Sequence, residues 1–212
     1  MNSVSRAPLQ ARSRQTMERL LTATLAVIEE KGLAGVTIPG VAASAGLSPG
    51  SVYRRFDDKE AMIRIAFLRF LEWSQETNQA SLGSDRLQAL TLDEALLALS
   101  RGLVAQYRGR TGLLKALDQY LEVQGDSAFR ERAVSIIEAN LRLVIDALRP
   151  FHDRIAAADP ERAITFALLS AITLIEAHKL HNSPVWRRVL PLDDDALAAE
   201  AARGMSAYIA RR

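Results

Sequence analysis

Polar and positively charged side chains gather in one short segment of this 212-residue chain. The segment opens with Ser48-Pro49, a helix-capping residue followed by proline at the first helical position. The helix that this start predicts, residues 49–56, presents small hydroxyls, a tyrosine and two arginines on its outer side: Ser48, Gly50, Ser51, Tyr53, Arg54 and Arg55. Hydroxyl groups bond phosphate oxygens, and arginine bonds either phosphate or the O6 and N7 edge of guanine. The segment therefore predicts a surface for nucleic acid.

Catalytic and metal-binding patterns have less support. Residues 46–50 fit the G-x-S-x-G pattern of a hydrolase nucleophile, but that pattern must follow a strand, and residues 41–45 predict a helix. His178 and His181 stand three residues apart, yet no wider metal motif surrounds them, and the chain has no cysteine. We predict no catalytic residue, no metal and no cofactor, and we expect that the protein is not an enzyme.

The elements that position these residues are predicted to be helices. Apolar residues recur at spacings of three and four, and alternating β-branched runs are nearly absent. Hydrophobic residues make up 49% of the chain and charged residues 25%, as in a globular protein. We predict an all-α fold of about nine helices, at residues 13–31, 37–46, 49–56, 57–78, 91–107, 111–123, 126–148, 160–180 and 193–208.

Residues 32–60 have the parts of a helix-turn-helix. Two short helices are joined by Ala45-Gly46-Leu47-Ser48, in which Gly46 gives the backbone the freedom that a tight turn needs. The apolar positions that would hold the pair against the first helix are Val41, Ala45, Leu47, Val52 and Phe56. The second helix of the pair would then carry the polar surface described above.

A series of residues at fixed spacing runs through this region: Thr37, Val41, Ala42, Ala45, Gly46, Leu47, Ser48, Gly50, Val52, Tyr53, Phe56, Lys59 and Glu60. In this series the sequence resembles the signature of TetR-family transcriptional regulators, over about residues 13–73. The resemblance implies a helical regulator that binds DNA through this N-terminal region. It also implies that the rest of the chain, which is divergent in the family, binds small molecules.

The resemblance assigns roles to individual residues. Thr37 would cap the second helix and touch phosphate, and Tyr53 and Lys59 would contact the DNA backbone. Pro49 and Gly50 lie at the groove-facing start of the recognition helix but carry no base-reading group. The predicted DNA contacts are Thr37, Ser48, Pro49, Gly50, Ser51, Tyr53, Arg54, Arg55 and Lys59, with Ser51, Arg54 and Arg55 the expected base readers.

The chain is expected to divide into three parts. Residues 1–12 would form a flexible basic arm, and residues 13–60 the helix-turn-helix domain, with a linking helix to about residue 78. Residues 79–212 would form the ligand-binding and dimerisation domain. The net charge of +2 lies wholly in residues 1–60, with its excess in the arginines of the tail. Such an arm either adds phosphate contacts or remains a solvated tail.

Polar groups on the otherwise apolar helices of the second domain are candidates for orienting a ligand. They are Tyr107, Gln119, Tyr120, Asn140, Glu176 and His178. Because the surrounding residues are apolar, the expected effector is a hydrophobic small molecule.

The helix near residues 163–177 is apolar all round, so it must be covered on two sides. We predict that the helices at 161–181 and 194–210 pair with those of a second copy in a four-helix bundle. The longest charge-free run, residues 163–175, is shorter than the ~18–20 residues that span a bilayer. No export segment is evident at the start of the chain either, so we expect no membrane partner and a cytoplasmic, nucleoid-associated protein of bacterial type.

These observations predict a dimeric DNA-binding regulator, most simply a repressor, that reads a near-palindromic operator and is released by a small molecule. The alternative is a helical ligand-binding or scaffold protein whose helix-turn-helix no longer reads DNA. Weak basicity and the missing polar side chains at Pro39, Gly40, Pro49 and Gly50 favour that alternative slightly.

Overall fold

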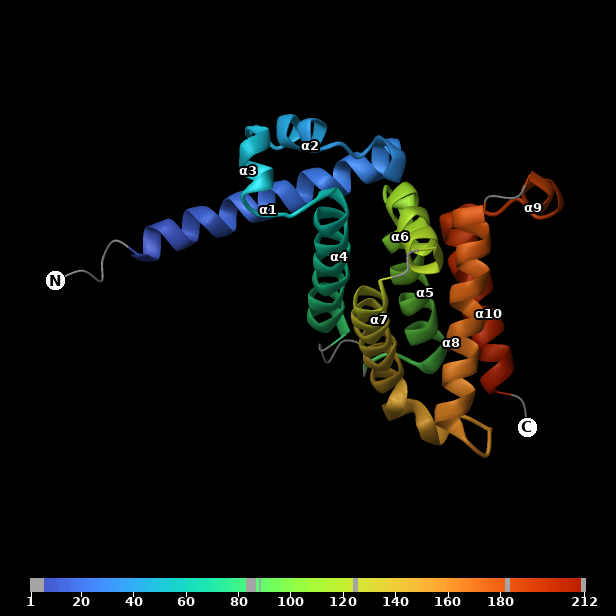
Figure 1. Cartoon of the computed structure of the whole chain (residues 1–212). Coiled ribbons are helices and arrows are strands. Elements are labelled where there is room, and N and C mark those ends of the chain that lie inside the picture. The colour runs from blue at the N-terminus through green and yellow to red at the C-terminus, as the bar shows by residue number, and fades with distance from the viewer. Residues whose placement is uncertain (1–5, 83–86, 88, 124–125, 182–183, 211–212) are drawn as a thin grey trace. The chain divides into compact units, whose positions relative to one another are not determined.

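The computed structural model describes residues 6–82, 87, 89–123, 126–181 and 184–210. Regular structure in these residues is entirely helical (Figure 1), so the predicted all-α fold is confirmed. The α-helices are α1 (Arg6–Lys31), α2 (Ile38–Ser44), α3 (Pro49–Tyr53), α4 (Lys59–Leu82), α5 (Leu92–Tyr107), α6 (Thr111–Val123), α7 (Ser127–Leu148), α8 (Pro160–Glu176), α9 (Pro184–Val189) and α10 (Asp194–Ile209). Two 3₁₀-helices, η1 (Leu33–Gly35) and η2 (Arg149–Arg154), and one π-helix, η3 (Ala177–His181), are also present in the described residues.

The helices form two compact units. The first holds residues 1–73 and 112–134, and the second holds residues 74–111 and 135–212. Residues 112–134 therefore group with the N-terminal helices, whereas the sequence predicted one domain over residues 79–212. The reason is the packing of α6, whose buried face contacts the start of α4: the rings of Phe67 and Tyr120 lie 5.4 Å apart. The predicted division of function between domains stays a prediction.

Helix boundaries in the first unit differ from the predicted ones at two places. Helix α1 begins at Arg6, so residues 6–12 extend the helix instead of forming an arm, while residues 1–5 lie outside the described residues. Pro8 does not prevent this, because it falls in the first turn, where no intrahelical donor is needed. Helix α3 ends at Tyr53, before the predicted end at Phe56.

The core of the second unit is formed by α5, α7, α8 and α10. In it α10 packs against both α5 and α8, which run beside it (Figure 1). Fully buried side chains from all four helices meet there: Leu96, Leu148, Ile164, Leu168, Ile175, Leu197 and Ile209. The short helix α9 was not predicted.

Helix α8 has two apolar faces of different exposure. One face is buried in the core, with Ala167 and Ala171 each 4% exposed. The opposite face leaves Phe166 55%, Leu169 46% and Leu174 44% exposed. Residues 160–181 are long and apolar enough to cross a membrane by length and composition, a test that core helices of water-soluble proteins also pass.

Candidate nucleic-acid interface

The turn between α2 and α3 is fixed by local hydrogen bonds and by one arginine from α1. Thr37 caps α2, since its Oγ1 accepts a 3.1 Å hydrogen bond from the Gly40 amide, as the sequence predicted. Gly46 has φ +63°, a left-handed conformation that glycine adopts without strain. Next to it, a guanidinium nitrogen of Arg19 donates to the carbonyl of Ala45, which ties the end of α2 to α1.

Buried apolar side chains hold α3 in place behind its polar surface. Val41 and Val52 are 0% exposed and Phe56 is 3% exposed, as expected for the residues that fix the pair of helices. On the outer side Ser48, Pro49 and Gly50 are exposed, as is Arg54, and Tyr53 is 62% exposed. The expected exposure of Ser51 is wrong: this residue is 8% exposed, because it lies next to Val52 on the side of α3 that faces the core.

The buried serine organises both arginines. Ser51 Oγ accepts a 2.9 Å hydrogen bond from Arg54 Nη2 and shares one of 3.2 Å with Ser48 Oγ. Arg55 Nη1 donates to the carbonyl of Ser51 over 3.1 Å. The Nε of Arg55 is buried and, among the described residues, has no hydrogen-bond partner.

Lys59 stands at the start of α4, beside a polar contact between α4 and α6. Its Nζ lies 3.8 Å from Glu60, and its side chain is 43% exposed. Glu60 in turn accepts a 3.0 Å hydrogen bond from the hydroxyl of Tyr120. Burial of the ring, together with that carboxylate, raises the pKa of Tyr120 to about 12. Just before Lys59, Asp58 caps α4 by accepting from the Ala61 amide over 2.6 Å.

A second carboxylate fixes the start of α6. Glu29 of α1 accepts hydrogen bonds from the amides of Gly112, at 3.2 Å, and Leu113, at 2.6 Å. The backbones meet closely there, since a Cβ on Gly112 would lie 2.4 Å from the carbonyl oxygen of Glu29. Carboxylates are favourable at a helix N-terminus. Helix α6 is therefore bonded to α1 as well as to α4.

The residues predicted to bind a ligand do not form one cluster. In the second unit the Tyr107 hydroxyl donates to Glu176 over 3.1 Å, and Asn140 bonds Asn78 separately. His178 lies in the π-helix with Nε2 buried and, in the described part of the chain, without a hydrogen-bond partner. Gln119 and Tyr120 belong to the first unit, where Gln119 is exposed and Tyr120 is a core residue.

A cleft of about 290 Å³ opens in the second unit between α4, α5 and α7. The lining residues are Thr77, Asn78, Ser81, Leu82, Leu87, Ala98, Leu99, Gly102, Leu103, Gln106 and Val144, and none of them is charged. Gln106 donates to Asn78 over 3.2 Å, and Asn78 donates to Asn140 over 3.2 Å. Sequence reasoning missed Asn78 and Gln106; the available signal was Gly102, a glycine inside a helix, where it costs about 0.5–1 kcal/mol relative to alanine.

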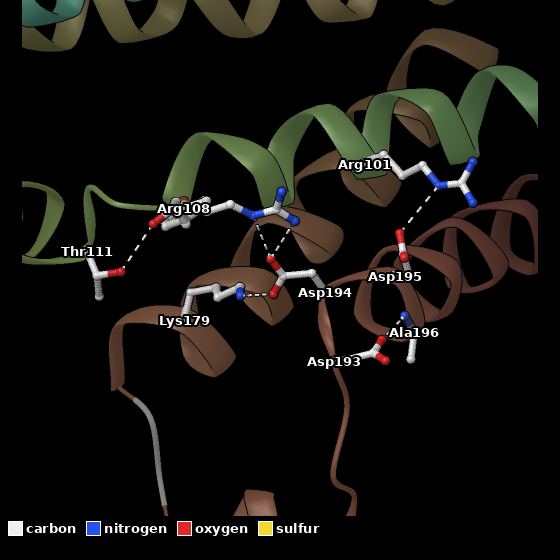
Figure 2. A network of polar contacts seen from close by, with 9 residues as sticks. Arg101, Arg108, Thr111, Lys179, Asp193, Asp194, Asp195 and Ala196 are labelled. Atoms are coloured by element: carbon white, nitrogen blue, oxygen red, sulfur yellow. Dashed lines mark hydrogen bonds and ion pairs between the residues drawn. The ribbon is translucent and has the colours of Figure 1, made fainter.

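A group of charged residues in the second unit surrounds Asp194 (Figure 2). Arg108 donates to this carboxylate from Nε at 3.2 Å and from Nη2 at 3.0 Å, and Lys179 approaches from the π-helix. The bond from Lys179, followed by those from Arg108, lowers the pKa of Asp194. Its neighbour Asp193 caps α10 by accepting from the Ala196 amide over 2.8 Å. Among the residues with a described placement, no group of three His, Cys, Asp or Glu could hold a metal.

Comparison with known proteins agrees with this arrangement. Residues 20–65 match the family described as bacterial regulatory proteins, tetR family. The chain is 28% identical over 130 residues to the HTH-type transcriptional repressor KstR2 of Rhodococcus jostii, a match that covers 58% of this chain and 64% of that protein. Thus less than two thirds of the length of KstR2 is matched.

Solved structures share the fold over nearly the whole chain. One is a Mesorhizobium loti protein described as a TetR-family transcriptional regulator, with a TM-score of 0.69, 18% identity and coverage of 94% of this chain and 97% of that one. Another is the transcriptional regulator FadR of Bacillus subtilis in complex with stearoyl-CoA, with a TM-score of 0.67, 17% identity and coverage of 92% and 99%. Residues 20–65 thus match the TetR family of bacterial regulatory proteins, and nearly the whole chain shares its fold with a solved structure described as a TetR-family regulator.

Proposed function

We propose that the protein is a transcriptional repressor that binds a near-palindromic DNA operator as a dimer and releases it when a small molecule binds. The observation that carries this proposal is the outer surface of α3, where Tyr53 and Arg54 are exposed over a core that fixes the helix. Hydroxyl, phenol and guanidinium groups are the donors that DNA phosphates and base edges accept. The family and the repressor KstR2 support the same function. Such a protein acts in the cytoplasm, on the nucleoid.

The exposed face of α8 is the proposed dimer interface. Phe166 and Tyr208 of α10 are about half exposed, and their ring centroids lie 4.9 Å apart. Between the two helices runs an apolar groove of about 200 Å³ that also contains Leu174 and Gly204. Contiguous exposed apolar surface of this kind marks interaction sites. A second copy packed on α8 and α10 would place two recognition helices in successive major grooves, about 34–36 Å apart.

The uncharged cleft at α4, α5 and α7 is the proposed effector site. Its walls are leucine, alanine and valine, and its polar side is formed by the amides of Asn78 and Gln106 with two hydroxyls. Such a lining favours an uncharged, mostly apolar molecule that carries a carbonyl or hydroxyl group. FadR is described in complex with stearoyl-CoA, whose acyl chain is apolar, and this supports an effector with an apolar chain here as well.

Helix α4 provides the proposed connection between effector and DNA. It is continuous from Lys59, a proposed phosphate contact, to Leu82, which lines the cleft. An effector that prefers one position of α4 shifts the dimer toward one spacing of its recognition helices. With effector bound, the preferred spacing of the two recognition helices would not match the spacing of the two operator half-sites.

Repeated selection of random duplex DNA by the purified protein, at fixed moderate salt, tests the proposal. We expect recovery of a near-palindrome with half-sites about one helical turn apart. Recovery of no sequence above the salt-sensitive background, by protein shown to be free of bound small molecules by mass spectrometry, would favour the alternative of a helix-turn-helix that no longer reads DNA.

A further inference from the structure

The two adjacent arginines at the end of α3 have different surroundings. Arg54 is exposed, whereas Arg55 is partly buried and has a buried Nε. One donor of Arg55, which lies just beyond the end of α3, is used on the carbonyl of Ser51 within that helix. From the sequence, both arginines are equal candidates for base or phosphate contacts. The structure gives them different environments, and this difference predicts which of them contacts a base of the proposed operator.

The side chain of Arg54 folds back along α3 toward Gly50. Its Nη2 donates to Ser51 Oγ at 2.9 Å, and its Nη1 lies 3.7 Å from the position that a Cβ on Gly50 would occupy. The guanidinium therefore lies over Gly50, within ordinary van der Waals distance of a Cβ at that position. Ser51 is 8% exposed and is also bonded to Ser48. Burial and this hydrogen bond therefore fix the position of the hydroxyl that bonds Arg54.

We infer that Arg54 is the base-reading side chain of α3, that it takes a guanine in each operator half-site, and that Ser51 positions it. An arginine guanidinium has five donors in a planar fork, of which Ser51 uses one. Two parallel donors remain for the O6 and N7 atoms of guanine, the pairing that arginine makes most often in the major groove. The neighbouring exposed residues Pro49 and Gly50 present no side-chain donor, and the hydroxyl of exposed Ser48 is shared with Ser51.

Arg55 has a different role in this inference. Its contact with the Ser51 carbonyl satisfies an acceptor at the end of α3, and its buried Nε is not directed at solvent. It therefore holds the helix and does not select a base. Tyr53 and Lys59, both exposed or half-exposed, bond phosphate and carry no sequence preference.

The inference rests on the proposed function, and a panel of variants tests it on the operator recovered by DNA selection. Wild-type protein, Arg54→Gln, Arg54→Lys, Arg55→Gln and Ser51→Ala are each titrated with that operator and with symmetric substitutions at every position of the half-site, at one salt concentration. For wild-type protein, replacing the guanine should weaken binding roughly 5- to 150-fold per half-site, as for a lost bidentate pair.

Arg54→Gln should bind guanine-containing and guanine-lacking operators almost equally, with the preferences at all other positions retained. Arg54→Lys should keep part of the guanine preference, since lysine also bonds that edge. Ser51→Ala should reduce the guanine preference by a smaller factor, without changing affinity for operators that already lack the guanine. Arg55→Gln, the matched control, should weaken binding to every operator by the same factor.

Two results would overturn the inference while leaving the proposed function intact. One is an Arg54→Gln protein that is folded, as judged by circular dichroism, and loses affinity equally for all operator variants. The other is an Arg55→Gln protein whose preference at one base pair disappears. A wild-type protein that selects no sequence at all would instead remove the proposed function, and this inference with it.

Discussion

The outward surfaces of α3 and α8 are opposite in chemistry, although both helices rest on well-buried cores. Helix α3 exposes Tyr53 and Arg54 beside small residues, and helix α8 exposes Phe166, Leu169 and Leu174. A surface of donors suits a polyanion, whereas an apolar surface is stable only when another apolar surface covers it. In the proposed function these are the two partner surfaces of one chain, and the exposed side chains of each surface indicate the chemistry of its partner.

The two units also differ in how closely their helices approach at a glycine. Polar contacts join helices in both units, through Glu29 in the first and Tyr107 in the second. In the first unit, Gly112 is so close to α1 that a Cβ would have no room. In the second unit, Gly102 borders a cleft, and a Cβ there would meet no atom within 4 Å. A close backbone contact suits a fixed recognition surface, and open space suits an effector.

The largest effect should come from charging the α8 surface. Phe166→Glu would bury a carboxylate in the proposed dimer interface, at a cost of about 3–5 kcal/mol for an unpaired buried charge. We expect sedimentation velocity to show monomers. The binding free energy for a palindromic operator should weaken by at least the free energy that dimerisation loses.

The matched control is Val134→Glu, which changes an apolar residue that is 51% exposed on α7. This variant should remain dimeric and bind DNA as the wild-type protein does. Dimers of Phe166→Glu with unchanged stability would show that α8 and α10 are not the interface.

The next effect should come from removing the phosphate contacts. Lys59→Ala and Tyr53→Ala should each weaken operator binding roughly tenfold or more, as for a lost charge-assisted hydrogen bond. Loss of the lysine should also reduce the slope of log affinity against log salt by about 1 per subunit. Helicity and dimerisation should be unchanged, since both side chains are substantially exposed.

If the salt slope of Lys59→Ala equalled that of the wild-type protein, Lys59 would not be a phosphate contact. The DNA-binding surface that is compared with α8 would then consist of α3 alone, without the start of α4.

Local signals made part of this molecule predictable. Thr37 is confirmed as a helix cap, because a cap depends only on residues three apart. Asp193 and the Thr91–Glu94 capping box start the helices predicted at residues 193–208 and 91–107 in the same local way. The burial of Ser51 depends on how α3 packs against α2, and the Glu29 contact joins residues 83 positions apart. Neither contact produces a periodic pattern in the sequence, so the sequence overestimated the exposed part of α3 and did not indicate that α6 packs with the N-terminal helices.

Alkaline pH should destabilise the first unit through Tyr120. With a pKa of about 12 in the folded protein and about 10 when unfolded, the phenol is essentially neutral in both states below about pH 9. Between pH 10 and 12 only the unfolded state ionises, so the free energy of unfolding should fall by about 2–3 kcal/mol as pH rises.

Urea unfolding at pH 9 and pH 11.5 measures this change, and Tyr120→Phe, which cannot ionise, isolates it. The variant should lose less stability than the wild-type protein over the same interval. Equal losses in both proteins would mean that Glu60 and the buried ring do not protect the phenol.

The smallest effects should come from adding single methyl groups, and they compare the two interiors directly. Gly102→Ala adds a Cβ where no atom lies within 4 Å, inside a helix that glycine weakens. It should raise the free energy of unfolding by about 0.5–1 kcal/mol. Gly112→Ala should lower it, because its Cβ would lie 2.4 Å from the Glu29 carbonyl oxygen and α6 must move away. Thermal unfolding of the two variants checks the signs, and a stabilising Gly112→Ala would mean that α1 and α6 are not closely packed and that the two units do not differ in the way that their glycines indicate.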